Sequence, residues 1–314
     1  MPYNSLVSRT DAAALVPEQV SQAMLSNLQS ASAVLSLGTR IPVARNQVRF
    51  PVLSALPTAY FVSGDTGLKQ TTEAAWANKY LNIEEIAAIV PIPEAVLDDA
   101  GFDVWGSIRP LMEQAIGRTL DSAVFFGTSA PGAWPTNLVA ASVAAGNVVA
   151  RGTTTQANGG LAADLVNLFG TVWADGYDVT GIAANTTVRP RLLNARNTQG
   201  DQYGDQLGLN NILGTEVTYP MRGLWPSGLS AAELIAGDFG NLVVGVRQDM
   251  TYKLITEGVI TDAGGLVVYN LPQQDMVAMR LVFRVGWQVA NPINYDQGTE
   301  ADRYPFGVLR SPAA

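Results

Sequence analysis

Apolar residues recur at helical spacing near the start of the chain, between Glu18 and Leu37. A spacing of three or four residues places them on one face of an amphipathic helix; they are Val20, Met24, Leu28, Val34 and Leu35. The residues before this stretch are polar and turn-prone. The pattern predicts either an extended arm that carries a helix or a first helix packed on a globular core, and it does not separate the two.

The period changes to two in the next segment. Val48, Phe50 and Val52 alternate with less apolar neighbours, as in a strand with one buried face. A second β-rich stretch covers Tyr80 to Ile92, and the connection Leu53–Lys79 is rich in Gly, Thr, Ser and Ala. Structureless connections beyond about 12 to 15 residues are uncommon unless they reach for something outside the domain. The segment therefore predicts a long hairpin with a polar tip.

A long helix is predicted from Asp103 to Gly127. Asp103 is a preferred N-cap residue and Gly127 is the residue type that most often follows a helix end. The residues between them form one apolar stripe, made by Trp105, Ile108, Met112, Ala115, Ile116, Thr119, Leu120, Ala123 and Val124. Pro110 lies inside the stripe, so we expect a kink near Gly106 or a restart from Ser107.

The remaining chain alternates between helix and strand signals, without internal repeats or linkers between independent domains. We expect a helix at Leu161–Asp175, a short strand at Thr180–Thr187 and a short basic helix at Val188–Asn197. A polar loop follows from Asn197 to Asn211. Further strands are expected at Leu242–Val246, Thr251–Thr256, Gly265–Tyr269 and Met276–Val289, with a closing strand at Tyr304–Arg310. The predicted fold class is α+β.

The composition of this chain of 314 residues excludes most of the usual catalytic side chains. It contains no His and no Cys, which excludes imidazole bases, thiolate nucleophiles, disulfides and the usual zinc ligands. The net charge of −8 argues against a broad basic face for nucleic acid. Charged residues make up only 15% of the chain and hydrophobic residues 47%, so apolar area remains for a partner. No segment has the pattern of a secretory signal or a membrane-spanning helix.

None of the candidate catalytic or metal-binding motifs has the residues and the spacing that its chemistry needs. The run from Gly64 to Lys69 does not match a phosphate-binding loop, and Ser129 has no base to activate it. Glu84 and Glu85 are adjacent in a strand and point to opposite faces, so they cannot act as a glycosidase pair. Asp98 with Asp99, and Asp201 with Asp205, fit solvated turn residues better than ligands. We therefore expect no catalytic residues, no metal site and no cofactor.

Sixteen of the 19 basic residues are arginine. Arginine favours bidentate ion pairs between protein surfaces, although codon bias in a GC-rich genome would give the same ratio.

Short segments in a fixed order resemble the major capsid proteins of tailed phages. The resemblance spans about Ala14 to Tyr295, and no single motif decides it; the matching segments are Ala14–Val20, Pro57–Val62, Leu68–Thr71, Trp76, Ile92–Ala100, Leu120–Gly127, Gln274–Arg280 and Val289–Pro292. The resemblance implies the Hong Kong 97 type of capsid fold. Many members begin with a long scaffolding segment, but here the first matching segment lies within the first 20 residues. Scaffolding is then either a separate protein or not used.

The resemblance also implies a division of the chain into four parts. These are an N-terminal arm at 1–46, an E-loop hairpin at 47–92, a P-domain at 93–158 and 271–296 with its spine helix at 103–127, and an A-domain at 159–270 and 297–314.

The implied function is structural. Copies would self-assemble as hexamers and pentamers into an icosahedral shell around double-stranded DNA, without sequence-specific binding and without a membrane. A separate scaffolding protein, a portal and decoration proteins are the other expected partners, and the expected location is the virion capsid, assembled in the host cytoplasm. Two alternatives stay open: an encapsulin-like compartment that encloses a cargo enzyme and, from another class, a carboxylate-dependent glycoside hydrolase.

Three groups of residues are candidates for contacts in the shell. The intersubunit candidates are Arg40, Arg45, Arg49, Tyr60, Phe61, Lys69, Trp76 and Lys79. The loop expected at the capsomer axis contains Asp201, Gln202, Tyr203 and Asp205. Some relatives join a lysine to an asparagine covalently, and the residues present for such a bond are Lys69, Lys79, Asn291 and Asn294. Because the acids near these asparagines lie in a polar tail, we expect a shell without such crosslinks.

Overall fold

The computed structural model describes residues 32–62, 69, 71–99, 103–196, 203, 207–220 and 223–312. Its helices are α2 (Ala33–Leu37), α3 (Glu94–Asp98), α4 (Val104–Phe126), α5 (Leu138–Ala144), α6 (Gly160–Ala174) and α7 (Val188–Asn194). Its strands are β1 (Thr39–Pro42), β2 (Gln47–Ala55), β3 (Ala75–Asn82), β4 (Glu84–Pro93), β5 (Val148–Ala150), β6 (Gly181–Ala184), β7 (Asn211–Ile212), β8 (Thr215–Thr218), β9 (Ala232–Gly237), β10 (Leu242–Ile255), β11 (Val259–Thr261), β12 (Val267–Asn270), β13 (Met276–Val289) and β14 (Phe306–Arg310).

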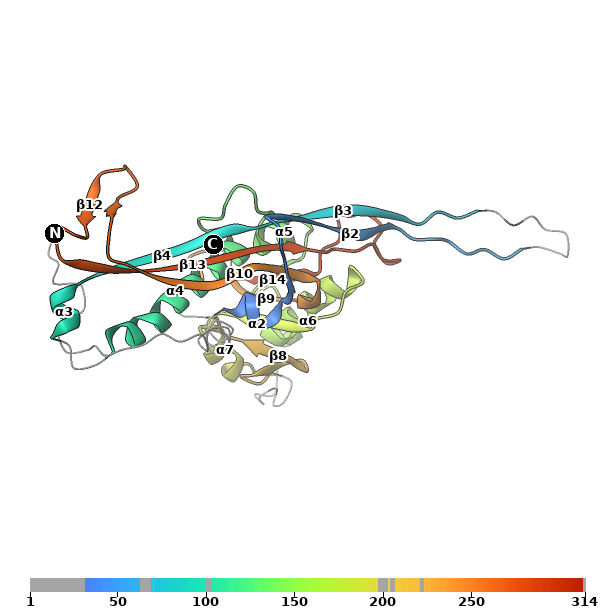
Figure 1. Ribbon diagram of the computed structural model, residues 1–314. Coiled ribbons are helices and arrows are strands. Elements are labelled where there is room, and N and C mark those ends of the chain that lie inside the picture. The colour runs from blue at the N-terminus through green and yellow to red at the C-terminus, as the bar shows by residue number, and fades with distance from the viewer. Residues whose placement is uncertain are drawn as a thin grey trace.

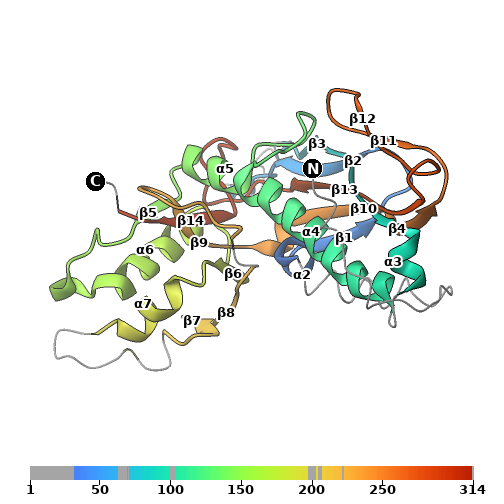
Figure 2. The ribbon, with the colours of Figure 1, turned by 90° about the vertical axis from the view of Figure 1, so that its left-hand side faces the viewer.

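Two sheets form what we call the body. One has four strands in the order β1-β10-β13-β4, and the other has six in the order β5-β14-β9-β6-β8-β7. In Figure 2 they lie side by side, with α4 running across the first and α6 and α7 beside the second. The mixture of helices and strands confirms the predicted α+β class.

The long helix is confirmed as α4, and its caps are those that the sequence predicted. The Asp103 carboxylate accepts a hydrogen bond from the Gly106 amide at 2.8 Å, and Gly127 ends the helix with a φ of 72°. The buried stripe of α4 packs against the four-stranded sheet in the largest apolar cluster. The predicted restart from Ser107 is wrong, because the helix runs through Pro110 without a break. Gly106, whose carbonyl loses its partner at Pro110, is exposed and can bond to water.

The six-stranded sheet is buried on both faces. Ile182, Leu234 and Leu309 face α6 and α7 in one apolar cluster. Their neighbours Ala183, Ile235 and Val308 belong to the cluster around α4. The predicted closing strand is confirmed as β14, which lies between β5 and β9 in this sheet and pairs with both.

The predicted hairpin is confirmed, but its second strand begins earlier than expected. β2 pairs antiparallel with β3, from Gln47 opposite Asn82 to Ala55 opposite Ala75. The expected strand at Tyr80–Ile92 is divided between two sheets, because β4 pairs with β13 instead. Similarly, the two strands expected at Leu242–Val246 and Thr251–Thr256 are one strand, β10, with irregular pairing between its halves. The pair β2–β3 extends away from the body, toward the right in Figure 1.

β10 lies in the four-stranded sheet, although it falls in the 159–270 segment that the resemblance assigns to an A-domain. That division into four parts stays a prediction. Residues 1–31 lie outside the described residues, so the predicted arm and most of the helix at Glu18–Leu37 cannot be compared with the structure; α2 covers its last residues.

Candidate assembly surfaces

The long hairpin, residues 47–82, exposes large apolar side chains along its outer half. Phe61 is fully exposed, Trp76 is 64% exposed and Tyr60 is 42% exposed. All three were intersubunit candidates. Large exposed apolar side chains gathered on one projecting element mark an interaction site in a soluble protein. Lys69, the described lysine of the tip, is also exposed.

A pair of glycines lets the hairpin cross the four-stranded sheet at close range. Gly245 and Gly286 lie opposite each other on β10 and β13. A Cβ atom at Gly286 would lie 2.1 Å from the carbonyl oxygen of Asn82, and one at Gly245 would lie 2.7 Å from the Leu81 side chain. Leu81 is fully buried there and forms a small cluster with Val43 and Ile83. The hairpin base is therefore held by few apolar contacts.

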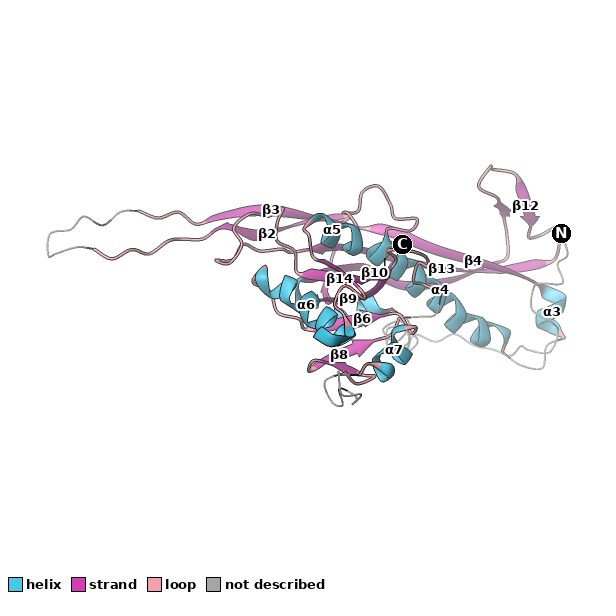
Figure 3. Cartoon of the chain, turned by 180° about the vertical axis from the view of Figure 1, so that it is seen from behind, coloured by secondary structure: helices cyan, strands magenta, loops and turns pink. Residues whose placement is uncertain are grey.

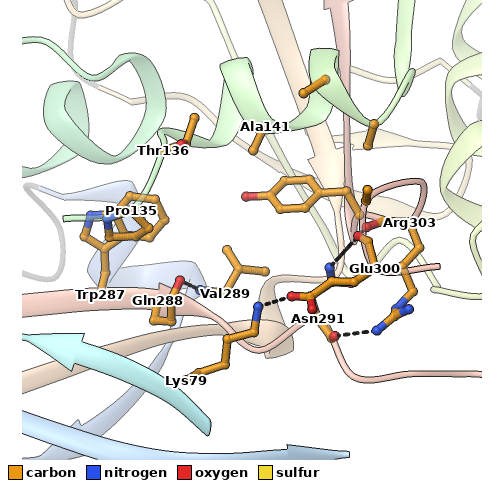
Figure 4. A pocket seen from close by; sticks show the side chains of 14 residues that line it. Lys79, Pro135, Thr136, Ala141, Trp287, Gln288, Val289, Asn291, Glu300 and Arg303 are labelled. Atoms are coloured by element: carbon orange, nitrogen blue, oxygen red, sulfur yellow. Dashed lines mark hydrogen bonds and ion pairs between the residues drawn. The ribbon is translucent and has the colours of Figure 1, made fainter. Parts of the chain in front are cut away.

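A cavity of about 480 Å³ lies where the hairpin meets the body. Figure 4 shows Lys79 at its edge, paired with Glu300, and Asn291 close by. Trp287 closes another side, and its indole N–H is buried without a hydrogen-bond partner. The cavity thus brings together two of the crosslink candidates, Lys79 and Asn291, with Glu300 beside them, within a single subunit.

The two candidate asparagines are already engaged within the chain. Asn291 is buried, and its side-chain amide donates to the carbonyl of Arg303 at 3.1 Å. The side-chain amide of Asn294 donates to the carbonyl of Asp175 at 2.6 Å. These bonds occupy the groups that a crosslink would need, and they agree with the expectation of a shell without crosslinks, which itself stays a prediction.

The arginine candidates lie at the start of the described chain. Arg40 is on β1, Arg45 is in the turn before the hairpin and Arg49 is on β2, and all three are exposed. They bring positive charge to the side of the hairpin base. Their role between subunits stays a prediction.

Of the four candidates for the capsomer-axis loop, the structure describes Tyr203. Its hydroxyl donates to the carbonyl of Gly159 at 3.0 Å, just before α6. Asp201, Gln202 and Asp205 lie outside the described residues. The placement of this loop near an axis stays a prediction.

A second projecting hairpin was not among the sequence candidates. β11 and β12 pair at the end of the molecule opposite the long hairpin (Figure 1). Leu266 is 71% exposed and Val267 is 59% exposed. The sequence predicted one of its strands, at Gly265–Tyr269, but not β11, since a short two-stranded element has no core that would give it a clear period.

Buried charges in the body are held by partners within the chain. The carboxylate of Glu233 accepts from Arg151 at 2.8 Å and lies 2.6 Å from Arg191. Burial raises the pKa of Asp121 to about 6, while hydrogen bonds from Ser32, Ala33 and Val34 lower it. Burial also raises the pKa of Glu113, which accepts from the Tyr252 hydroxyl at 2.9 Å. This pattern is typical of structural ion pairs and not of an exposed reactive site.

Within the described residues, no group of three or more acidic side chains is placed to hold a metal ion. A search of the same residues for a helix that is long and apolar enough to cross a membrane also found none.

The chain as a whole is similar to known proteins. The chain is 24% identical, over 89% of its length and 83% of the relative's, to the major capsid protein of Staphylococcus phage 80alpha. A solved structure from Microbacterium phage Oxtober96 matches 98% of this chain and 97% of its own, with 35% identity and a TM-score of 0.79. A structure from Mycobacterium phage Cain matches 90% of this chain and 91% of its own, with 30% identity and a TM-score of 0.78.

The comparison with family models gives the same result as the individual relatives. The model described as the phage capsid family matches residues 12–294, which is most of the chain. This range includes both strands of the long hairpin, α4 and the whole of β13. The chain belongs to the phage capsid family.

Proposed function

We propose that the chain is the major capsid protein of a tailed double-stranded DNA phage, whose copies assemble as hexamers and pentamers into the icosahedral shell of the virion. The observation that carries this is the long hairpin, whose outer half leaves Tyr60, Phe61 and Trp76 exposed in the subunit. An element with that much exposed apolar surface is stabilised when a neighbouring molecule covers it. The family to which the chain belongs supplies the neighbour, which is another copy of the chain.

In this proposal the four parts implied by the resemblance keep their boundaries. Residues 1–46 act as the arm and 47–92 as the E-loop. Residues 93–158 and 271–296 act as the P-domain with its spine helix at 103–127, and 159–270 with 297–314 act as the A-domain. The role of the chain is mechanical, with no reaction step and no cofactor. Assembly takes place in the host cytoplasm with a portal and decoration proteins as further partners, and scaffolding is either supplied by a separate protein or not used.

The charge distribution suits a container for DNA. Met1–Phe50 carries a formal charge of +2, and the rest of the chain carries −10. An acidic wall does not bind the DNA phosphates, so the DNA can slide during packaging. We therefore propose that the shell encloses the genome without sequence-specific contacts.

Electron microscopy of the purified, overexpressed chain tests the proposal. Rings, tubes or closed shells are expected, with or without a co-expressed scaffolding protein. A single small species at high concentration and physiological salt, under both conditions, would contradict it. The content of native particles separates the two kinds of shell, because nuclease-protected genomic DNA supports a phage capsid and a protein cargo supports an encapsulin-like compartment.

A further inference from the structure

The segment between β13 and β14 touches both strands of the long hairpin. We call residues Asn291–Arg303 the joint loop. On the β2 side, the amide of Ile293 donates to the carbonyl of Leu53 at 3.1 Å, and the Tyr295 hydroxyl donates to the carbonyl of Pro57 at 3.1 Å. On the β3 side, Glu300 pairs with Lys79. The joint loop therefore contacts the hairpin from two directions at the place where it leaves the body.

Arg303 holds the joint loop from the inside. Its side chain is only 3% exposed. Its guanidinium donates to four backbone carbonyls of the loop, those of Asn291 at 3.3 Å, Pro292 at 3.1 Å, Gln297 at 3.5 Å and Gly298 at 3.0 Å. None of the ion pairs found in the described part of the chain includes Arg303. A planar group with five donors can satisfy this ring of acceptors, whereas a lysine ammonium cannot span it.

The joint loop is also fixed to the body on the side away from the hairpin. The Tyr177 hydroxyl, which follows α6, lies 2.6 Å from the carbonyl of Pro292 and 2.9 Å from the Asn291 side chain. Asp175 accepts from the amide of Tyr304 at 2.8 Å, directly after the loop. The loop thus connects the six-stranded sheet region to the hairpin, and Figure 4 shows Arg303 beside the Lys79–Glu300 pair.

Few other contacts hold the hairpin against the body. At its base, Leu81 is buried against Val43 and Ile83, which flank the hairpin in the chain, with Val48 and Phe50 partly buried beside them. The pairing of β2 with β3 keeps the hairpin intact but does not fix its angle to the body, since both strands move together. The angle must come from the crossing at the glycine pair, from the contacts of the joint loop and from two further hydrogen bonds. In these, the Gln288 side chain donates to the carbonyl of Tyr80 at 3.2 Å, and the Asn82 side chain donates to the carbonyl of Ala133 at 2.7 Å.

We propose that Arg303 is a positioning residue for shell assembly: by holding the joint loop, it fixes the direction in which the hairpin leaves the body. The proposal rests on the proposed function, because direction matters only if the hairpin must meet a neighbouring copy. The alternative is that Arg303 stabilises the fold and has no effect on hairpin direction. The two explanations predict different hairpin directions in a variant that still folds: the first predicts a changed or broadened direction, and the second predicts no change.

The absence of cysteine makes the direction measurable, because two introduced cysteines are the only labelling sites. Spin labels at Ser54→Cys on β2 and Gln114→Cys on α4 report the distance between hairpin and body in dilute, unassembled subunits. Arg303→Met keeps an apolar chain of similar length but removes the donors. We expect a broadened distance distribution and loss of closed shells, while the melting of the body remains cooperative.

Arg151→Met is the matched control. Arg151 is a partly buried arginine that follows β5 of the six-stranded sheet, and it is paired with Glu233, away from the hairpin. Its distance distribution should equal that of the parent. An unchanged distribution in Arg303→Met, or equal broadening in both variants, overturns the proposal.

If Arg303→Met fails to fold, the double variant Tyr295→Phe and Glu300→Gln decides the question. Both side chains are exposed, so their replacement leaves the core intact. Loss of one neutral hydrogen bond changes the equilibrium between attached and detached hairpin by roughly 2- to 12-fold. We therefore expect the amide hydrogen-exchange rates of the hairpin to rise by about that factor or more. Unchanged exchange and an unchanged distance distribution overturn the proposal. Because these readings use unassembled subunits, they are independent of whether the parent chain forms shells, which is the test of the proposed function.

Discussion

The body and the long hairpin solve the problem of apolar surface in opposite ways. In the body, α4 and the two sheets enclose Leu120, Phe283 and Trp287, each of them at most 1% exposed. In the hairpin, Phe61 is fully exposed and Trp76 is 64% exposed. Figure 3 shows the difference in shape, with layered helices and strands on one side and two isolated strands on the other. The body buries its large apolar side chains within the subunit, whereas the hairpin leaves its own exposed for a neighbouring subunit to cover.

This difference separates folding from assembly within a single chain. An isolated two-stranded hairpin is marginal in water, so the long hairpin gains its stability from the base, the joint loop and other copies. The body can fold first and present the hairpin in a defined direction. Changes in the body should therefore act through folding, and changes in the hairpin should act through assembly.

Removal of the hairpin tip should have the largest effect on assembly. Ala55 and Ala75 lie opposite each other at the end of the β2–β3 ladder, so residues 56–74 can be replaced by an Asn-Gly turn. The shortened chain should melt cooperatively like the parent but form no shells. Calorimetry and electron microscopy check the two halves of this prediction. Loss of cooperative melting would place the tip in the core instead.

Leu120→Ala should cause the largest loss of stability. Leu120 is fully buried on α4, and truncation of such a residue costs about 2 to 5 kcal/mol, depending on how far the site collapses. Denaturant unfolding of the unassembled subunit measures the loss. Leu111→Ala, at a 61% exposed position on the same helix, is the control and should change stability by less than about 0.5 kcal/mol.

Asp121 should make the body more stable in mild acid than at neutral pH. Its pKa is about 6 in the folded chain, above the ordinary 3.8, mainly because of burial. The folded state then binds the proton more tightly, so the contribution of this group falls as the pH rises from about 4 to 6. Relative to Asp121→Asn, the parent should lose up to about 3 kcal/mol across this range. Unfolding free energies of both chains at pH 4 and 7 test this, and a constant difference would contradict it.

Phe61→Ser should leave the subunit as stable as the parent and weaken assembly. A surface substitution changes folding stability by about 0.5 kcal/mol or less, whereas an aromatic side chain buried at an interface contributes about 2 kcal/mol or more. The critical concentration for shell formation, measured by light scattering, should rise. Leu229→Ser, at a 69% exposed position on the body, is the control. Equal effects of the two changes would remove the special role of the hairpin.

The smallest expected effect is on covalent stability. Lys79 is paired with Glu300, and Asn291 is buried with its amide bonded inside the chain. Mature particles boiled in detergent should give one band near the mass of a single chain, and Lys79→Ala should not change it. A ladder of bands that Lys79→Ala or Lys69→Ala abolishes would show a crosslink and identify the lysine.

The elements with strong local signals were predictable from the sequence. The caps at Asp103 and Gly127 gave the ends of α4, and β13 has the predicted bounds Met276–Val289. The strand β9 was missed, because it is buried on both faces and so shows no alternation of apolar and polar residues. The start of β3 at Ala75 was missed because the half-buried positions Ala75, Ala77 and Lys79 are small or charged, while Trp76 and Tyr80 are exposed.

The candidate surfaces were predictable as elements but not as contacts. Tyr60, Phe61 and Trp76 were candidates because the long hairpin was expected to reach a neighbour, and the structure shows all three exposed. The meeting of Lys79 with Glu300 depends on chain positions 221 residues apart, which no local pattern encodes. Arg303 gave no signal either, because its partners are backbone carbonyls and not acidic side chains.

Hydrogen exchange of the same chain before and after assembly tests the division between body and hairpin most directly. Amides of α4 and β13 should be protected in dilute subunits and in shells alike. Amides of residues 47–62 and 71–82 should exchange rapidly in the subunit and become protected only in the shell. A hairpin that is protected equally in both states, or a body that gains its protection only on assembly, would contradict the account.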